Sequence, residues 1–540
     1  MRNDESAARG AAPHDKSTRI DEPRRRALRA AFFTVAASQW LTACGGNNSD
    51  SSNATPAPSA APSPPTSPSP PTSPSPPTSP SPPSPTASPT PAPTSAPAPV
   101  PTPEPTFAPT PAPAAGSLPD WVPAAGQLAV LTNGNGKLAN RFRDVCPVYY
   151  DAENSVKIVN DFSTSFKNPY WGFYGGQVFF GGGHAGTNNN MVVVAEYGQA
   201  AITFKRVCDP TPWFGTSAAF QTDNATGNAN SKLNFDYYES TIDGKPGSPH
   251  SYASGDIIGP EHGGAACGTF VQVIAAAVNY ANDGGAVAAH KLDFNDTTSA
   301  ASARSWQRVT NATANASFGD WPAPLYTAFV PPQNRIYITP NGPNKDGVVR
   351  WFDLATRTWV VGTGMGFNNG ESDGFDSGIM FFVPSRNLLI FMYPFETVLK
   401  VQWMDVSPGK TQPTLGGTAL LSQTVRVGSS AATTSWSAAC WCPLNNRILV
   451  AGVFNGSTMD TTAVYEISIP NVLTNLWVVE RAPLGAGQSL VPPDTQLDRG
   501  VTWKKFFYDE KVRSVVYFPL ASPDSNDTVY VYRPRFTGTG

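Results

Sequence analysis

Residues 119–540 are predicted to form an all-β domain built as a ring of similar four-stranded sheets, a β-propeller. Three observations support this prediction. Short runs of β-branched and aromatic residues recur between Gly, Pro and Asn, long amphipathic helical patterns are absent, and one strand–turn–strand pattern repeats along the chain.

The individual strands are predicted from short runs rich in β-branched, aromatic and other apolar residues, bounded by turn-forming residues. The clearest of these runs lie at 177–180, 191–194, 335–338, 387–391, 447–450 and 514–518. Each has the length and composition of a strand buried in a sheet.

The repeat consists of a strand, a tight turn of the Pro or Asn type, and a second strand. It occurs at 329–338, 382–390, 440–450 and 507–516, and each copy predicts a β-hairpin. Further strands at 348–354 and 358–359 follow the first of these copies, which makes four strands in the unit. Four-stranded units at this spacing suit propeller blades, because each blade buries its faces only against its neighbours.

Six blades are expected, near 170–213, 250–310, 325–361, 377–425, 435–481 and 500–536, and residues 140–165 could form a seventh. The last of these units ends after its third strand. An early strand near 128–131 is therefore expected to complete it and to close the ring with the N-terminal segment.

A glycine-rich segment and a set of tryptophans refine this prediction. Gly181-Gly182-Gly183-His184 follows a second strand, and four tryptophans follow or lie in fourth strands: Trp213, Trp306, Trp359 and Trp477. In these features residues 170–536 resemble the kelch/galactose-oxidase-like propellers. The resemblance implies a fold and says little about function, since one fold hosts many activities.

The N-terminus carries an export pattern. Arg24 and Arg25 begin a basic cluster, a short apolar run spans 30–37, and the tetrapeptide Leu41-Thr42-Ala43-Cys44 follows. This arrangement resembles a bacterial lipoprotein signal of the twin-arginine or the Sec type, and the apolar run is too short to span a bilayer. The alternative is an uncleaved amphipathic N-terminus.

The resemblance implies that residues 1–43 are a signal peptide and that Cys44 is lipidated and becomes the mature N-terminus. Two or more acyl chains make a stable anchor. The expected location is the cell envelope, as an outer-membrane lipoprotein that faces the periplasm or the cell surface, since Gly45 rather than Asp follows the cysteine.

Residues 44–118 are predicted to be a disordered linker. They consist almost entirely of Pro, Ser, Thr and Ala, and one hexapeptide occurs at 65–70, 71–76 and 77–82. Such a composition cannot bury enough apolar surface to fold, and proline favours an extended conformation. The linker is therefore interpreted as a spacer that holds the domain away from the lipid surface.

The charge of the domain argues against nucleic acid as a partner. The first 118 residues carry eight Lys or Arg and seven Asp or Glu, which leaves about −4 on the rest of a chain whose total is −3. A nucleic-acid surface would need a basic patch or stripe.

Two histidines are the best candidates for metal ligands. In this topology His184 lies between a second and a third strand and His250 precedes the next blade, so both are expected at one rim. His262 is expected at a first-to-second hairpin on the opposite face, and His290 within a third strand. A three-histidine site is thus not expected. A transition metal at His184 and His250 is one hypothesis, and histidines that only hydrogen-bond neighbouring blades are the other.

The same rim is expected to hold the binding residues, which are charged or aromatic residues predicted in connections: His184, His250, Tyr252, Trp321, Asp346, Glu371, Asp373, Glu396, Trp436 and Arg499. Residues 368–376 also space oxygen ligands like the first half of a calcium loop, although an ordinary turn explains them as well. No nucleophile elbow, phosphate loop or zincin motif occurs, so the catalytic residues are unknown.

Five cysteines remain beyond Cys44. Cys440 and Cys442 share one face of a predicted strand and are poorly placed to bond each other. A disulfide between Cys146 and Cys208 is one hypothesis, and buried free thiols that pack as small apolar groups are the other.

Taken together, the sequence favours a lipid-anchored binding or scaffolding propeller for a glycan or protein partner. The alternative is an exported metal-assisted oxidoreductase or carbohydrate-active enzyme at the His184/His250 rim. An enzyme predicts a bound metal or a strongly shifted histidine in a deep cleft, whereas a binding module predicts a chemically inert, aromatic-lined rim.

Overall fold

The structure is a computed structural model of the chain. It describes residues 117–145, 164–180, 191–210, 245–246, 255–273, 289–309, 325–340, 347–367, 378–428, 436, 438–490, 505–518 and 528–535. The chain divides into two units, Met1–Pro109 and Thr110–Gly540, and every described residue belongs to the second. The predicted signal peptide and nearly all of the predicted linker therefore lie outside the described residues.

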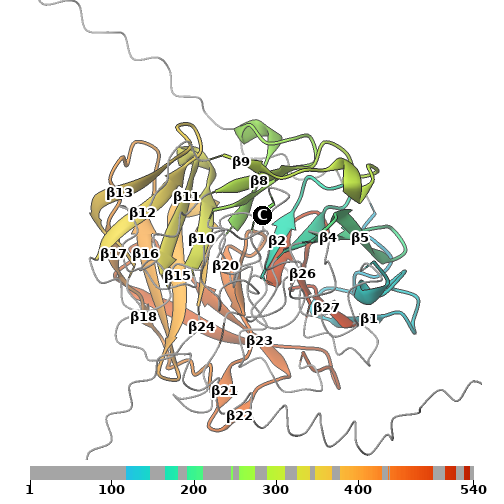
Figure 1. The fold of residues 1–540 in the computed structure, drawn as a ribbon. Coiled ribbons are helices and arrows are strands. Elements are labelled where there is room, and N and C mark those ends of the chain that lie inside the picture. Colours follow the sequence, from blue (N-terminus) through green and yellow to red (C-terminus); the bar gives the residue numbers. More distant parts are fainter. Residues whose placement is uncertain are drawn as a thin grey trace, which may run out of the picture. The chain divides into compact units, whose positions relative to one another are not determined.

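The described part of the chain is a six-bladed β-propeller. Six sheets of four or five strands surround a common centre, and Figure 1 shows them following one another in chain order from β2 to β27. Within each blade, neighbouring strands of the four-stranded unit pair antiparallel. The all-β prediction and the count of six blades are confirmed.

The first three blades take their strands in consecutive order. Blade 1 contains β2 (Thr164–Asn168), β3 (Gly176–Phe180), β4 (Val192–Tyr197) and β5 (Ile202–Cys208). Blade 2 contains β6 (Gly255–Ile258), β7 (Thr269–Gln272), β8 (His290–Asp293) and β9 (Gln307–Arg308). Blade 3 contains β10 (Leu325–Val330), β11 (Arg335–Pro340), β12 (Val348–Asp353) and β13 (Thr358–Met365).

Blades 4 and 5 follow the same plan with one addition. Blade 4 contains β14 (Ile379–Val383), β15 (Leu388–Phe395), β16 (Val398–Asp405) and β17 (Leu415–Thr418). Blade 5 contains β19 (Ala439–Cys442), β20 (Arg447–Val450), β23 (Ala463–Ser468), β24 (Leu476–Pro483) and the outermost β18 (Leu420–Leu421). The small hairpin of β21 (Phe454–Asn455) and β22 (Thr458–Met459) lies between β20 and β23.

Blade 6 combines the two ends of the described chain. It contains β25 (Phe506–Asp509), β26 (Ser514–Tyr517), β27 (Thr528–Tyr532) and, as its outer strand, β1 (Leu128–Thr132). β1 pairs antiparallel with β27, with Leu128 opposite Tyr532. The 3₁₀ turn η1 (Phe142–Val145) follows β1, and the described residues contain no seventh blade.

The repeated turns between first and second strands share one backbone conformation. In blades 3, 4 and 5 the turn ends at an asparagine with positive φ, at Asn334, Asn387 and Asn446. Asparagine tolerates this left-handed conformation better than most residues, which is why it ends each of these hairpins. Arg513 takes the same role in blade 6 with a φ of 51°.

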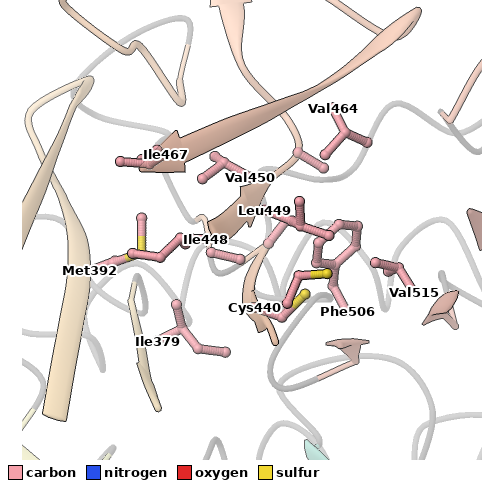
Figure 2. Packing of buried hydrophobic residues seen from close by; sticks show 14 of the residues in the cluster. Ile379, Met392, Cys440, Ile448, Leu449, Val450, Val464, Ile467, Phe506 and Val515 are labelled. Carbon is pink, nitrogen blue, oxygen red and sulfur yellow. The ribbon is translucent and has the colours of Figure 1, made fainter. Parts of the chain in front are cut away.

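Buried apolar clusters fill the interfaces between neighbouring blades. One cluster joins blades 1 and 2, one joins blades 2 and 3, and one joins blades 3 and 4. A larger cluster joins blades 4, 5 and 6, and Figure 2 shows Met392, Leu449 and Phe506 within it. The last cluster joins blade 6 to blade 1. Each blade therefore packs against both neighbours, as the ring requires.

Among the described residues, no helix has the length and apolar character needed to cross a membrane.

Candidate binding rim

The connections between strands differ sharply between the two faces of the ring. We call the face with the first-to-second and third-to-fourth connections the short-connection face. Four of its first-to-second turns are only four residues long, at 331–334, 384–387, 443–446 and 510–513. We call the opposite face, where second-to-third connections and the entries to the next blade meet, the long-connection face.

Most of the sequence between strands belongs to connections that begin and end at the long-connection face. The entries to the next blade span 209–254, 309–324, 366–378, 419–438 and 484–505. Loops displayed by a rigid scaffold commonly carry binding functions, because they vary without disturbing the core. This distribution makes the long-connection face the candidate binding rim.

Most of the residues predicted for this rim lie outside the described part of the chain. They are His184, His250, Tyr252, Trp321, Asp346, Glu371, Asp373 and Arg499. The calcium-like segment 368–376 and the two histidines proposed as metal ligands are among the residues not described. Their roles stay predictions.

Glu396 lies in the described part of the chain, and its role in binding stays a prediction. It occupies the two-residue turn between β15 and β16 on the long-connection face, with a φ of 55°. Its neighbour Phe395 is 39% exposed, and the ammonium of Lys400 lies 6.0 Å from the centre of the Phe395 ring. This turn therefore offers an exposed carboxylate beside an exposed aromatic ring.

Arg426 extends this surface toward blade 5. Its guanidinium donates a hydrogen bond of 2.8 Å to the Thr397 hydroxyl, and its backbone bridges Val398 and Phe454. The arginine is exposed. An aromatic ring with charges of both signs can bind sugars by stacking and hydrogen bonding, or a protein surface by the same contacts.

Trp436 differs from Glu396 in its burial. Its side chain is 1% exposed and packs in the cluster of blades 4 to 6. The indole N–H donates a hydrogen bond of 2.7 Å to the carbonyl of Ala451. In this structure the ring stabilises the core and leaves no surface for a partner.

The remaining histidines lie where the topology predicted. His262 ends the 3₁₀ turn η3 (Pro260–His262) between β6 and β7, on the short-connection face, and His290 begins β8, the third strand of blade 2. Burial lowers the pKa of His262 against the opposing effect of Glu261. Among the described residues, no group of three or more His, Cys, Asp or Glu side chains is arranged to hold a metal.

Polar contacts between blades gather on the short-connection face. The Tyr170 hydroxyl of blade 1 donates a hydrogen bond to Glu261 of blade 2, and burial raises the pKa of this tyrosine. Lys167 of blade 1 forms an ion pair of 2.5 Å with Glu510 of blade 6. These pairs join blades 2, 1 and 6 in order.

The start of the described chain is fastened to this same face. Trp121 is 2% exposed, packs edge-on against Tyr197, and donates its indole N–H to the carbonyl of Gly198 at 2.8 Å. The backbone of Asp120 and the carbonyl of Leu118 bond to Gln199. We call residues 117–122 the N-terminal clamp.

Three of the described cysteines are free thiols: Cys267, Cys440 and Cys442. Cys440 and Cys442 lie on β19, and burial raises the pKa of both. Figure 2 shows Cys440 among apolar side chains. These thiols pack as small apolar groups, as one of the two hypotheses held. Cys146 lies outside the described residues, so its pairing with Cys208 stays a prediction.

The fold and this surface define a class: a six-bladed β-propeller with short turns on one face and long connections on the other. No known family model matches the chain, and no curated protein matches it.

Similar solved structures include proteins of different function. An oligogalacturonate lyase in complex with manganese is 9% identical with a TM-score of 0.26, covering 50% of this chain and 63% of its own. An engineered GH43 glycoside hydrolase with endo-xylanase and exo-arabinofuranosidase activity is 11% identical with a TM-score of 0.28. This match covers 68% of the present chain and 60% of the hydrolase chain. A nidogen/laminin complex is 10% identical with a TM-score of 0.21, covering 46% and 76%.

This chain thus spans less than two thirds of the length of the lyase and hydrolase chains. Identities this low bear on the fold alone, and TM-scores this low carry no argument about what the protein does.

Two features of the site were missed by sequence reasoning. Phe395 and Arg426 were not among the predicted rim residues, although they lie beside Glu396 and Thr397. The Pro-Phe-Glu-Thr sequence at 394–397 was an available signal for Phe395, because a proline and a charged residue after an apolar run favour a turn, and turns lie at the surface. Nothing in the sequence near Arg426 indicates its contact with Thr397, which is 29 residues away.

Proposed function

We propose that the protein is a lipid-anchored propeller of the cell envelope that binds a glycan or protein partner through its long-connection face. The observation that carries the proposal is the unequal distribution of connections. Four-residue turns lie on one face, while connections such as 209–254 and 484–505 begin and end at the other.

The position of the N-terminal clamp supports this choice of face. Ser117 accepts a hydrogen bond from Tyr174 in the β2–β3 connection, which is on the short-connection face. A linker that ends at residue 118 therefore joins the propeller on that face. A partner is then expected to contact the face that the linker does not join.

The kelch-like character and the closure by an N-terminal strand belong to the same proposal. Trp477 lies in the fourth strand β24 and is fully buried, and Trp359 lies in the fourth strand β13, as the resemblance implies. The pairing of β1 with β27 supports the view that β1 fastens the last blade to the first.

The anchor is tested by replacing the predicted lipidated residue, Cys44→Ala. The wild-type protein is expected in the membrane fraction, with the mass of its N-terminal peptide increased by acyl chains. The variant is expected in the soluble fraction without that mass. A wild-type protein that is soluble, or a variant that stays with the membrane, would overturn the lipid anchor.

The binding role is tested with the Cys44→Ala protein on a panel of bacterial polysaccharides and isolated cell-wall sacculi. Retention on one of them that is lost in the Phe395→Ala variant supports a glycan-binding rim. Near-stoichiometric transition metal that is lost in His184→Ala or His250→Ala would instead favour the exported-enzyme alternative.

A further inference from the structure

Asp509 is a buried carboxylate at the interface of blades 6 and 1. It is the last residue of β25 and has no exposed surface. Its Oδ1 accepts hydrogen bonds from the backbone N–H groups of Lys511 at 2.8 Å and Val512 at 3.4 Å. Its Oδ2 is buried and has no hydrogen-bond partner.

The unpaired oxygen faces blade 1. A Cβ placed on Gly175, in the β2–β3 connection, would lie 3.4 Å from Asp509 Oδ2 and 3.3 Å from the carbonyl of Asn168. The carboxylate therefore reaches across the interface to the backbone of the neighbouring blade, where an added methyl group would already be in contact with it.

A charge in this position is costly. A buried carboxylate needs partners for both oxygens, and one without a partner favours the neutral, protonated form. Burial accordingly raises the pKa of Asp509 to about 6, against the opposing effect of Lys167.

The charged and titratable groups around Asp509 come from three elements. β2 contributes Lys167, whose Nζ is held 2.5 Å from Glu510, and β4 contributes Tyr197. The β25–β26 hairpin contributes Tyr508, Glu510 and Lys511, and the Lys511 ammonium donates to the carbonyl of Gly172 at 3.3 Å.

None of these neighbours bonds to Oδ2. Burial raises the pKa of Tyr197 and of Tyr508, so both stay neutral near neutral pH. Glu510 raises the pKa of Asp509, and burial lowers that of Lys511 from an ordinary value far above neutrality. Asp509 is thus a group at this interface whose charge changes in mildly acidic solution.

We propose that Asp509 is a pH-sensitive latch between the last and the first blade of the ring. The interface is tight when the carboxyl group is neutral and loosens when it is ionised, because the ion has an oxygen without a partner between two packed sheets. The latch lies beside the Lys167–Glu510 ion pair, another charged contact across the same interface.

The direction of the pH dependence follows from linkage. The folded state binds the proton of Asp509 more tightly than the unfolded state does, because the pKa of an aspartate in the unfolded chain has the ordinary value of 3.8. The protonated carboxyl group therefore gives its full stabilisation below pH 3.8. This stabilisation falls as the pH rises toward the folded-state pKa of about 6, and it is lost above pH 6.

The test is thermal unfolding of the full chain between pH 4 and 8, together with amide hydrogen exchange in 167–180 and 506–518. For the wild-type protein we expect the temperature of half-unfolding to fall as the pH rises through 6. Over the same pH range, amide exchange in these two segments should increase more than in the rest of the protein, after correction for intrinsic exchange rates. Asp509→Asn can keep the bonds to Lys511 and Val512 but cannot ionise. It is expected to remove this component of the pH dependence and to raise the midpoint by a few degrees at pH 7.5.

A matched control comes from blade 3. Asp353 also accepts bonds from the backbone N–H groups two and three residues ahead, Ala355 and Thr356, but it lies beside Arg335 at 3.8 Å and away from the interface of blades 6 and 1. In the Asp353→Asn variant, the unfolding temperature should depend on pH above 5 in the same way as in the wild-type protein.

A second variant keeps the test decisive if Asp509→Asn fails to fold. Lys167→Met removes the cation that opposes protonation, so the midpoint of the pH dependence should move to higher pH. The proposal is overturned if Asp509→Asn keeps the wild-type slope, if it lowers the unfolding midpoint at every pH, or if Lys167→Met leaves the dependence unmoved.

Discussion

The two faces of the propeller differ in their connections and in their contacts between blades. The short-connection face is made of tight turns and direct contacts between blades, such as Tyr170 with Glu261 and Lys167 with Glu510. The long-connection face carries most of the sequence between strands and, in its described part, an exposed turn at Phe395 and Glu396. One face thus adds polar contacts between blades to the buried apolar clusters, and the other is where the longer connections begin and end.

Among the described residues, each face displays one strongly exposed phenylalanine, and the surroundings of the two rings differ. Phe173, in the β2–β3 connection, is 76% exposed and contacts the ring of Tyr174, close to the N-terminal clamp. Phe395 is 39% exposed and lies with Glu396, Lys400 and the Arg426–Thr397 contact. Phe395 is therefore the better candidate for a binding residue although it is less exposed than Phe173, because it lies on the loop-rich face among charges of both signs.

The largest effect is expected from breaking the short-connection face at Trp121. Trp121→Ala removes a buried ring and its bond to Gly198, and should lower the free energy of unfolding by about 3–5 kcal/mol. Urea unfolding followed by tryptophan fluorescence and circular dichroism measures it.

A milder variant separates packing from the hydrogen bond. Trp121→Phe keeps an aromatic ring near Tyr197 but has no N–H for Gly198, and should cost about 1–2 kcal/mol. Stability that is unchanged in Trp121→Ala would show that the N-terminal clamp does not fasten blade 1.

A much smaller effect is expected from the ion pair on the same face. The side chains of Lys167 and Glu510 are 29% and 46% exposed, and ion pairs of that exposure contribute less than about 1 kcal/mol. Glu510→Gln should therefore change the stability by at most that amount, and by less in 1 M NaCl. A loss several times larger, measured by the same urea unfolding, would mean that this contact rather than the apolar cluster holds blades 6 and 1 together.

The sequence predicted the fold well because the repeats carry local signals. The Pro and Asn residues at 331–334 and 384–387 specify a turn that needs few long-range contacts, and the apolar runs on either side fix which strands follow. β18 was not predicted, because two residues, Leu420 and Leu421, make too short a run to be recognised and pair with β24 more than fifty residues later.

The candidate site was harder to predict, because its members are brought together by the ring. The burial of Trp436 depends on packing among blades 4, 5 and 6, and a lone tryptophan ahead of a strand does not reveal that. Tyr170 and Glu261 are 91 residues apart. The surroundings of the unpaired oxygen of Asp509 likewise include Gly175 from the first blade, which is far from Asp509 in the sequence but next to it in the ring.

The most direct test of the account asks which face a partner touches in living cells. The photo-crosslinking residue p-benzoylphenylalanine can replace Phe395 or, as the matched control, Phe173, since both side chains are exposed and aromatic. After irradiation, we expect a glycan or protein adduct, identified by mass spectrometry, from position 395 and none from position 173. An adduct from position 173 alone, or from neither position, would contradict the claim that the long-connection face is the binding face.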